Sequence, residues 1–347
     1  MKRGLVGLFL VTALLLLVSF NLTKSRVLVL HSADRSNGWA QRMDEGMRDV
    51  LKLNRRPVLV QWHYLGMERL TGEEDRQEAA LQAKRAIAQL RPDMVLAVDD
   101  EAQAYVAQHY AVAAGSAQAA QPETRIVFAA IDHPAAEYGY DQAANVTGIL
   151  ERLPLPAVRE ALPMLHRGQS ARIAVIGLAD KTGRGQTQQV QAFDWGPHRL
   201  VAALTLPDFD AWKAAIQQMS DQVDVLIVLS FDGLPLSAGS AQPARMTDIA
   251  AWIETHAKPL PMGIDSGFVE HGGGLAIAPS PREIGEVAMR QVLAWQRALD
   301  DGQSQAPAVV SNTQYRVAVR ESALRARGVA LPSIYLEAAR LDQLYFP

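Results

Sequence analysis

Short apolar runs alternate with helix-period segments along most of the chain, and this alternation restricts the possible folds more than any other feature. Amphipathic stretches separate the runs, as in Trp39 to Leu51, where Met43 and Met47 fall on one helix face. Strands that are apolar on both faces and alternate with helices indicate parallel sheets covered by helices on both sides. The runs of strand length are Val27–Leu30, Val58–His63, Met94–Val98, Arg125–Ala130, Ile173–Gly177, Leu200–Leu204, Val223–Leu229 and Leu260–Ile264.

The alternation occurs twice, which predicts two α/β lobes. Four of the runs precede a long polar connection, residues 132–145, and four follow it. A chain of 347 residues is also long for a single compact core. A short strand (Leu275–Ala278) and a long helix come next, and we expect them to return to the first lobe. The expected lobe 1 is residues 26–146 plus 275–305, and the expected lobe 2 is residues 147–274 plus 306–347.

Residues 1–25 have the pattern of an export segment. Lys2 and Arg3 are positively charged, and the run from Gly4 to Phe20 is almost wholly apolar. Such a segment is either a signal peptide that is removed or an anchor that stays in the inner membrane. In both cases the remainder, which has no second long apolar run, is expected to be a periplasmic protein.

The composition argues against several kinds of site. A net charge of −3 offers no clustered positive charge for nucleic acid, so we expect no nucleic-acid partner. The chain has no cysteine, which excludes a thiol nucleophile and a Cys-based zinc site. The histidines lack the H-x-x-x-H spacing of a zinc site, so neither a metal nor another cofactor is predicted.

Catalytic motifs are also missing. "HGGG" at His271–Gly274 is typical of an esterase oxyanion hole, but that chemistry also needs a G-x-S-x-G elbow. The nearest stretch, "GIDSG", has its serine one place too late. We therefore expect a binding protein and not an enzyme, with a hydrolase that uses Asp265 and His271 as an alternative.

Polar groups follow six of the predicted strands, where ligands bind in open parallel sheets. Carboxylates dominate and cations are few, which suits a polyhydroxyl compound or one with an amino group. Two alternatives remain: the aspartates cap helix N-termini, and Trp39 packs in the core. The candidate ligand-binding residues are Ser32, Asp34, Trp39, Asp99, Asp100, Asp132, Asp180, Lys181, Thr182, Phe231, Asp232 and Asp265.

Several stretches, in order along the chain, resemble one protein family. They include "VLVLHSADRSNGWAQRMDEGMRDVL", "PDMVLAVDDEAQAYV", "ARIAVIG" and "PMGIDSGFVEHGGGLAIAPSPREIGEVAMRQVLAW". Together they resemble the substrate-binding proteins of ABC transporters with the type I periplasmic fold. The opening "LHS…W…G" and "HYLGMER" are similar to the variant that serves as the extracytoplasmic sensor domain of bacterial signalling proteins.

The resemblance implies two Rossmann-like lobes that close on a small molecule at a hinge. It implies one of two partners, the membrane permease of an ABC transporter or a signalling receptor such as a histidine kinase or cyclase. The sequence shows no output domain and no N-terminal lipoprotein cysteine, so the choice stays open. The implied ligand contacts are Ser32, Trp39, Asp99 and Asp132 on the first lobe, and Leu178–Thr182, Phe231, Asp232 and Asp265 on the second.

Overall fold

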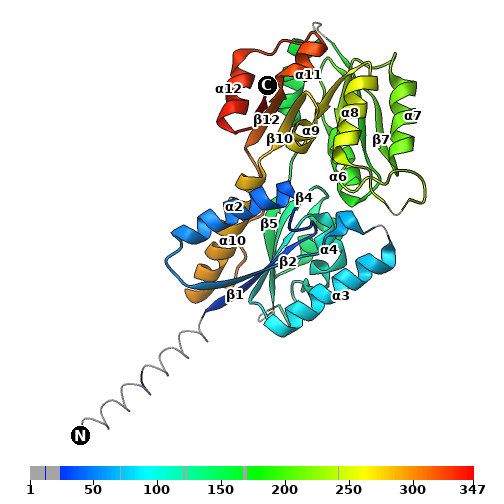
Figure 1. Cartoon of the computed structure of the whole chain (residues 1–347). Helices are drawn as coiled ribbons and strands as arrows, with labels where there is room; N and C mark the ends of the chain where they lie inside the picture. Colours follow the sequence, from blue (N-terminus) through cyan, green and yellow to red (C-terminus); the bar gives the residue numbers. More distant parts are fainter. Residues whose placement is uncertain are drawn as a thin grey trace, which may run out of the picture.

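The computed structural model describes residues 12, 24–70, 72–119, 122, 124–166, 170–240 and 242–347. Apart from residues 12, 24 and 25, the predicted export segment lies outside these ranges. The described chain forms two α/β lobes placed end to end (Figure 1), which confirms the predicted fold class. Within the described ranges, no helix combines the length and the apolar character that crossing a membrane requires.

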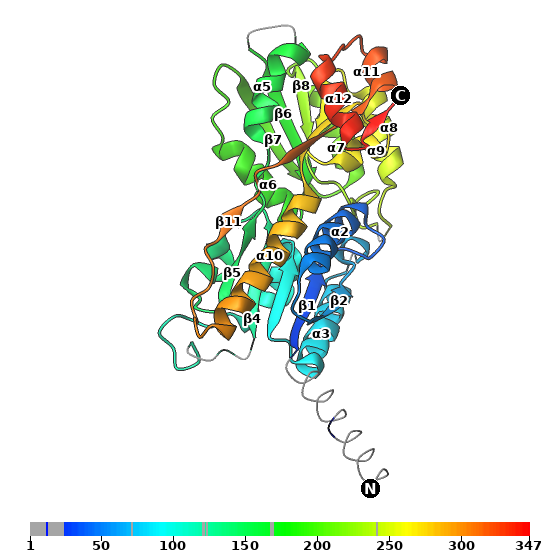
Figure 2. The same cartoon turned by 90° about the vertical axis from the view of Figure 1, so that its left-hand side faces the viewer.

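The first lobe is built on a six-stranded sheet in the order β11-β5-β4-β3-β1-β2, with all neighbours parallel. Its strands are β1 (Ser25–His31), β2 (Val58–Tyr64), β3 (Met94–Val98), β4 (Arg125–Ile131), β5 (Val146–Leu150) and β11 (Val310–Ser311). Helices α2 (Gly38–Leu53) and α10 (Pro281–Asp300) cover one face, and α3 (Glu73–Leu90) and α4 (Asp100–Tyr105) cover the other. Figure 2 shows α2 and α10 side by side.

The second lobe is built on a seven-stranded sheet in the order β13-β12-β10-β9-β8-β6-β7. Neighbours are parallel except β10 and β12, which are antiparallel. The strands are β6 (Arg172–Leu178), β7 (Arg199–Leu206), β8 (Val225–Val228), β9 (Leu260–Gly263), β10 (Leu275–Pro279), β12 (Tyr315–Arg320) and β13 (Tyr345–Phe346).

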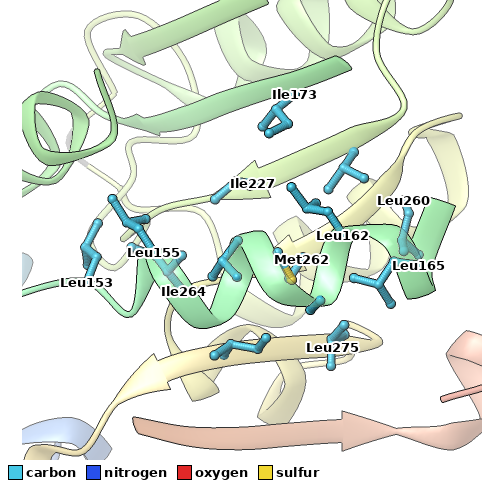
Figure 3. Close-up of a cluster of buried hydrophobic side chains, with 14 of the residues drawn as sticks. Leu153, Leu155, Leu162, Leu165, Ile173, Ile227, Leu260, Met262, Ile264 and Leu275 are labelled. Carbon is cyan, nitrogen blue, oxygen red and sulfur yellow. The ribbon is translucent and has the colours of Figure 1, made fainter. Parts of the chain in front are cut away.

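Two helical layers cover this second sheet. Helices α5 (Leu155–His166), α6 (Lys181–Ala192) and α12 (Ser333–Leu341) pack on one face. Helices α7 (Phe209–Met219), α8 (Met246–His256) and α9 (Ser266–Glu270) pack on the other. Figure 3 shows Leu155, Leu162 and Leu165 of α5 packed among buried strand residues. The other short elements are α11 (Glu321–Ala326), η1 (Met67–Arg69), η2 (Ala107–Tyr110), η3 (Ala135–Tyr138) and η4 (Tyr140–Gln142).

Each strand predicted from the apolar runs is present, with bounds that differ by a few residues at most. The alternation also explains why both faces of β1 are buried. Val27 and Val29 belong to the core beneath α2 and α10, whereas Leu28 and Leu30 belong to the core beneath α3. Helix α2 begins where the Asn37 side chain accepts hydrogen bonds from two backbone amides of its first turn.

The structure corrects the predicted lobe boundaries. Strand β5, at 146–150, pairs with β4, so the first lobe continues beyond residue 146. Strand β10, at 275–279, pairs with β9 and β12, and therefore belongs to lobe 2 and not to lobe 1. Strand β11, at 310–311, pairs with β5, so the chain stays in lobe 1 until that point. An apolar run predicts that a strand is buried, but it does not predict which sheet the strand joins.

The chain consequently crosses between the lobes after β5, after β10 and after β11. Two of these crossings are tied together, because Asn312 accepts a hydrogen bond from the Arg152 amide at 2.6 Å and donates one to its carbonyl at 3.1 Å. The third is tied through Glu283, whose carboxylate accepts the Thr313 hydroxyl at 2.8 Å. The three crossing segments thus form one connected hinge region.

Candidate functional site

The carboxyl ends of the strands in both sheets meet at a cleft between the lobes. The cleft contains a cavity of about 130 Å³, lined from lobe 1, from lobe 2 and from the crossing segments. Ser32 and Asp99 reach it from the ends of β1 and β3, and Ser230 and Asp265 reach it from the ends of β8 and β9. This is the position at which open parallel sheets bind ligands.

Most of the predicted ligand-binding residues lie together on the wall of this cavity. They come from both lobes, as the resemblance implied, and the exposed part of Trp39 supplies an apolar surface among them. Their contact with a ligand stays a prediction. The predicted residues that line the cavity are Ser32, Trp39, Asp99, Asp132, Asp180, Thr182, Asp232 and Asp265.

Asp34 and Asp100 lie behind the cavity wall and not on it. The Asp34 carboxylate accepts hydrogen bonds from the amide and hydroxyl of Ser36 at 2.8 and 2.7 Å, and so shapes the loop after β1. Asp100 is fully buried and accepts the backbone amide of Asp132 at 2.9 Å. Both aspartates therefore position the loops that carry the cavity residues.

Lys181 and Phe231 also lie away from the cavity wall. The Lys181 ammonium group is 5.1 Å from the centre of the Tyr138 ring, on the other lobe. Phe231 is 2% exposed and packs with its ring against Trp212 and Phe268. This placement does not support Phe231 as a ligand contact, because the ring turns into the core of lobe 2.

Three of the cavity aspartates also cap helices, as the alternative interpretation of these residues predicts. Asp99, Asp180 and Asp265 accept backbone amides at the starts of α4, α6 and α9, at 2.7, 2.7 and 2.5 Å. Asp99 has a φ of 74° and a ψ of 158°, a backbone conformation that residues other than glycine rarely adopt. Strain of this kind gathers at functional sites, where the surrounding structure holds it in place.

Burial controls the ionisation of the cavity carboxyl groups. Burial raises the pKa of Glu151 to about 8 and that of Glu101 to about 7. It raises the pKa of Asp99 and of Asp180 to about 6 each. The pKa of Asp132 is also raised, first by burial and then by the charge of Glu151. Removal from water disfavours each charged form, and neighbouring carboxylates add to the effect.

Residues that the sequence analysis missed complete the wall. Glu151 directly follows β5, which was not among the strands predicted from the apolar runs. The short apolar stretch within "NVTGIL" could have predicted this strand, and with it a polar residue at its end. Arg76 comes from α3 and forms an ion pair with Glu101. Gln186 is on α6, inside a helix and not at a strand end, so no strand-end rule could find it.

Direct hydrogen bonds join the two lobes around the cavity. Asn37 donates to Asp232 at 2.6 Å, and Thr182 donates to Asp99 at 2.9 Å. Gln189 of α6 donates to the Asp132 carboxylate at 2.8 Å. The structure therefore shows the lobes closed upon each other.

Comparison with known proteins gives a fold and no closer relationship. No protein-family model matches the chain, and no curated protein matches it. A conserved domain protein from Vibrio cholerae superimposes with a TM-score of 0.64 at 15% identity, over 91% of this chain and 98% of that one. An ABC domain from Streptococcus pneumonia, in complex with L-Trp, has a TM-score of 0.64 at 14% identity, with the same coverage.

A third similar structure is an open, ligand-free substrate-binding protein from Clostridium difficile. Its TM-score is 0.60 at 14% identity, over 89% of this chain and 96% of that one. At such identities, the likeness establishes the fold alone. The chain has the two-lobed α/β fold of type I periplasmic solute-binding proteins.

Proposed function

We propose that the chain is an extracytoplasmic solute-binding protein that captures a small polar ligand between its lobes and delivers it to an ABC transporter. The observation that carries the proposal is the cavity in the cleft, which both lobes line with polar side chains at the ends of their strands. A volume of about 130 Å³ suits a small solute and not a polymer.

The mechanism is binding coupled to hinge closure. A ligand that contacts both lobes stabilises the closed state by its differential affinity for that state. The three crossing segments supply the hinge, and the hydrogen bonds from Asn37 to Asp232 and from Thr182 to Asp99 form as the cleft closes. No covalent step is part of the proposal.

Structures with the same fold support a small ligand. One is described as a complex with L-Trp, one with D-arabinose and one with L-rhamnose. These ligands belong to those proteins, and at 12–14% identity they do not name the ligand here. They do show that this architecture accommodates both amino acids and sugars.

A periplasmic location and a membrane partner follow from the predicted export segment. The opening stretch after β1, with its similarity to sensor domains, favours a second candidate in which the closed form is presented to a receptor kinase or cyclase. The two candidates share the binding step and differ in the partner that recognises the closed lobes.

A thermal-shift screen of the purified chain tests the binding step that both candidates require. The panel contains amino acids, sugars, polyols, nucleosides, polyamines and aromatic acids. A ligand that binds only the folded state adds about 2.7 kcal/mol of stability at a hundred times its dissociation constant, so the unfolding midpoint rises. A panel without any shift would contradict the proposal.

A further inference from the structure

The wall of the cavity carries a large excess of acidic groups. The one basic side chain among the described residues that line it is Arg76, and Arg76 is paired with Glu101. No lysine or histidine joins it on the described wall. The carboxyl groups on the wall are those of Glu68, Asp99, Glu101, Asp132, Glu151, Asp180, Asp232 and Asp265.

The positive ends of helices offer no compensation. The N-termini of α4, α6 and α9 point at the cleft, and an N-terminus with free amides attracts anions. Here Asp99, Asp180 and Asp265 already accept amides of these first turns. A ligand carboxylate or phosphate would therefore meet capped helices and surrounding carboxylates.

Among these acids, Glu151 has the charge of Arg152 nearby but no ion pair within the described chain. Its side chain is 6% exposed, and within the described chain no hydrogen bond or ion pair reaches its carboxylate. The neighbouring Arg152 guanidinium instead donates to the backbone carbonyls of Glu151 and Asp132, at 2.6 and 3.4 Å. A buried acid without a partner is costly when charged, and burial accordingly raises the pKa of Glu151 to about 8.

A second acid of the wall also has a carboxylate oxygen without a partner among the described residues. Glu68 uses one carboxylate oxygen to accept the Asp34 amide at 2.8 Å. Its other oxygen is buried and has no hydrogen-bond partner among the described residues. Two acids on the same wall thus present unsatisfied acceptors.

We propose that the ligand is an organic cation, an amine or guanidinium compound without an anionic group, whose positive group lies against Glu151 and Asp132. The inference rests on the proposed solute-binding function and names its ligand class. A cationic donor would form charge-assisted hydrogen bonds with the carboxylates of Glu151 and Asp132, which make no ion pair within the described chain. Trp39, Met67 and Ile264 supply apolar wall for the remainder of the ligand.

Isothermal titration with matched triads tests the charge of the ligand. Each triad compares an amine with a neutral compound and a carboxylate-bearing compound of similar size: 2-phenylethylamine, 2-phenylethanol and phenylalanine; 1,4-diaminobutane, 1,4-butanediol and 4-aminobutanoate; glucosamine, glucose and glucuronate. We expect the amine of at least one triad to bind at least tenfold more tightly than its neutral and carboxylate-bearing partners.

Two variants locate the positive group. Glu151→Gln keeps the shape of the side chain and removes its charge, and should weaken binding of that amine at least tenfold. Asp132→Asn tests the second acid in the same way. Glu45→Gln removes a charge from the exposed side of α2 and should leave the affinity unchanged. An unchanged affinity in both acid variants would overturn the assigned position.

The outcomes separate this inference from the function on which it rests. Tighter binding of an alcohol, a plain sugar or a carboxylate-bearing compound would overturn the cationic ligand and leave solute binding intact. Binding of no compound, in the triads or in the wider thermal-shift panel, would overturn both.

Discussion

Glu151 occupies an unusual position for a carboxyl group, because its folded-state pKa of about 8 lies far above the value of about 4.3 in an unfolded chain. Between these values the folded protein binds more protons than the unfolded one. The stability from this group is therefore complete below about pH 4 and is lost as the pH rises to about 8. Several acids of the same wall act in the same direction.

Glu151→Gln should consequently stabilise the ligand-free protein in a pH-dependent way. Glutamine stays neutral, so the unfolding midpoint of the variant should exceed that of the wild type by an amount that grows from about pH 5 to about pH 8 and then levels off. Melting curves of both proteins across this range provide the measurement. The two proteins contain the same histidines, so the effect of histidine titration on stability cancels in the difference between their midpoints. A difference that shrinks as the pH rises would contradict the assigned environment.

Asp132 and Asp232 are the carboxylates that join the lobes through side-chain amides. Replacing either by alanine should weaken ligand binding more than tenfold, because a lost hydrogen bond to a charged group costs about 1.5–3 kcal/mol. Titration calorimetry with a solute identified by screening gives the affinities. Asp141→Ala, on the exposed surface of lobe 1, is the matched control. Unchanged affinity in both cavity variants would place the ligand elsewhere.

For individual residues, the sequence predicted a position in the cleft correctly where a polar residue follows the end of a strand. Asp99, Asp180 and Asp265 could be placed in the cleft because each directly follows an apolar run or comes within three residues of its end. Phe231 follows the same rule and lies in the core, because the turn after β8 directs its side chain between Trp212 and Phe268. That direction depends on the tertiary packing and leaves no trace in the local pattern.

Among the elements, α6 packs closely against lobe 1 at Gly185. A Cβ atom at Gly185 would lie 2.8 Å from the Asp132 Cβ atom and 2.9 Å from the His133 Cδ2 atom. Real Cβ atoms do not approach other atoms so closely. The glycine thus allows α6 of lobe 2 to rest on the end of β4 in lobe 1.

Gly185→Ala should impair closure without weakening the fold of lobe 2. Alanine favours a helix over glycine by about 0.8–1.0 kcal/mol, so the unfolding midpoint should not fall. The clash instead lowers the population of the closed state, which should weaken apparent ligand affinity about tenfold. Gln188→Ala, on the exposed side of the same helix, should leave affinity unchanged. Small-angle scattering should show a more open molecule for Gly185→Ala, and an unaltered profile and affinity would contradict this role.

Hydrophobic periodicity predicted most of the strands and helices, but it did not predict which sheet each strand joins. The run Leu275–Ala278 reads as a buried strand in either lobe, and pairing with β9 and β12 decides that it belongs to lobe 2. Strand β11 has two exposed residues and no apolar pattern of its own. Long-range pairing, and not local preference, places both.

For the whole molecule, we expect two rigid lobes that move about three crossing segments. Each lobe has its own buried core on both faces of its sheet. Hydrogen bonds at the cleft join the described parts of the two lobes, such as the one from Asn37 to Asp232. A solute in the cavity would add further contacts between the two lobes.

The distance between the lobes tests this account most directly. The chain has no cysteine, so spin labels can be placed at Leu81→Cys on α3 and Leu236→Cys in the loop after β8. Both positions are exposed, and they flank a groove at the mouth of the cleft that α3 and this loop line together. Double electron–electron resonance spectroscopy should show a broad distribution of distances between the two labels in the absence of solute. A solute that raises the unfolding midpoint should make the distribution shorter and narrower. Identical distributions with and without such a bound solute would contradict capture by hinge closure.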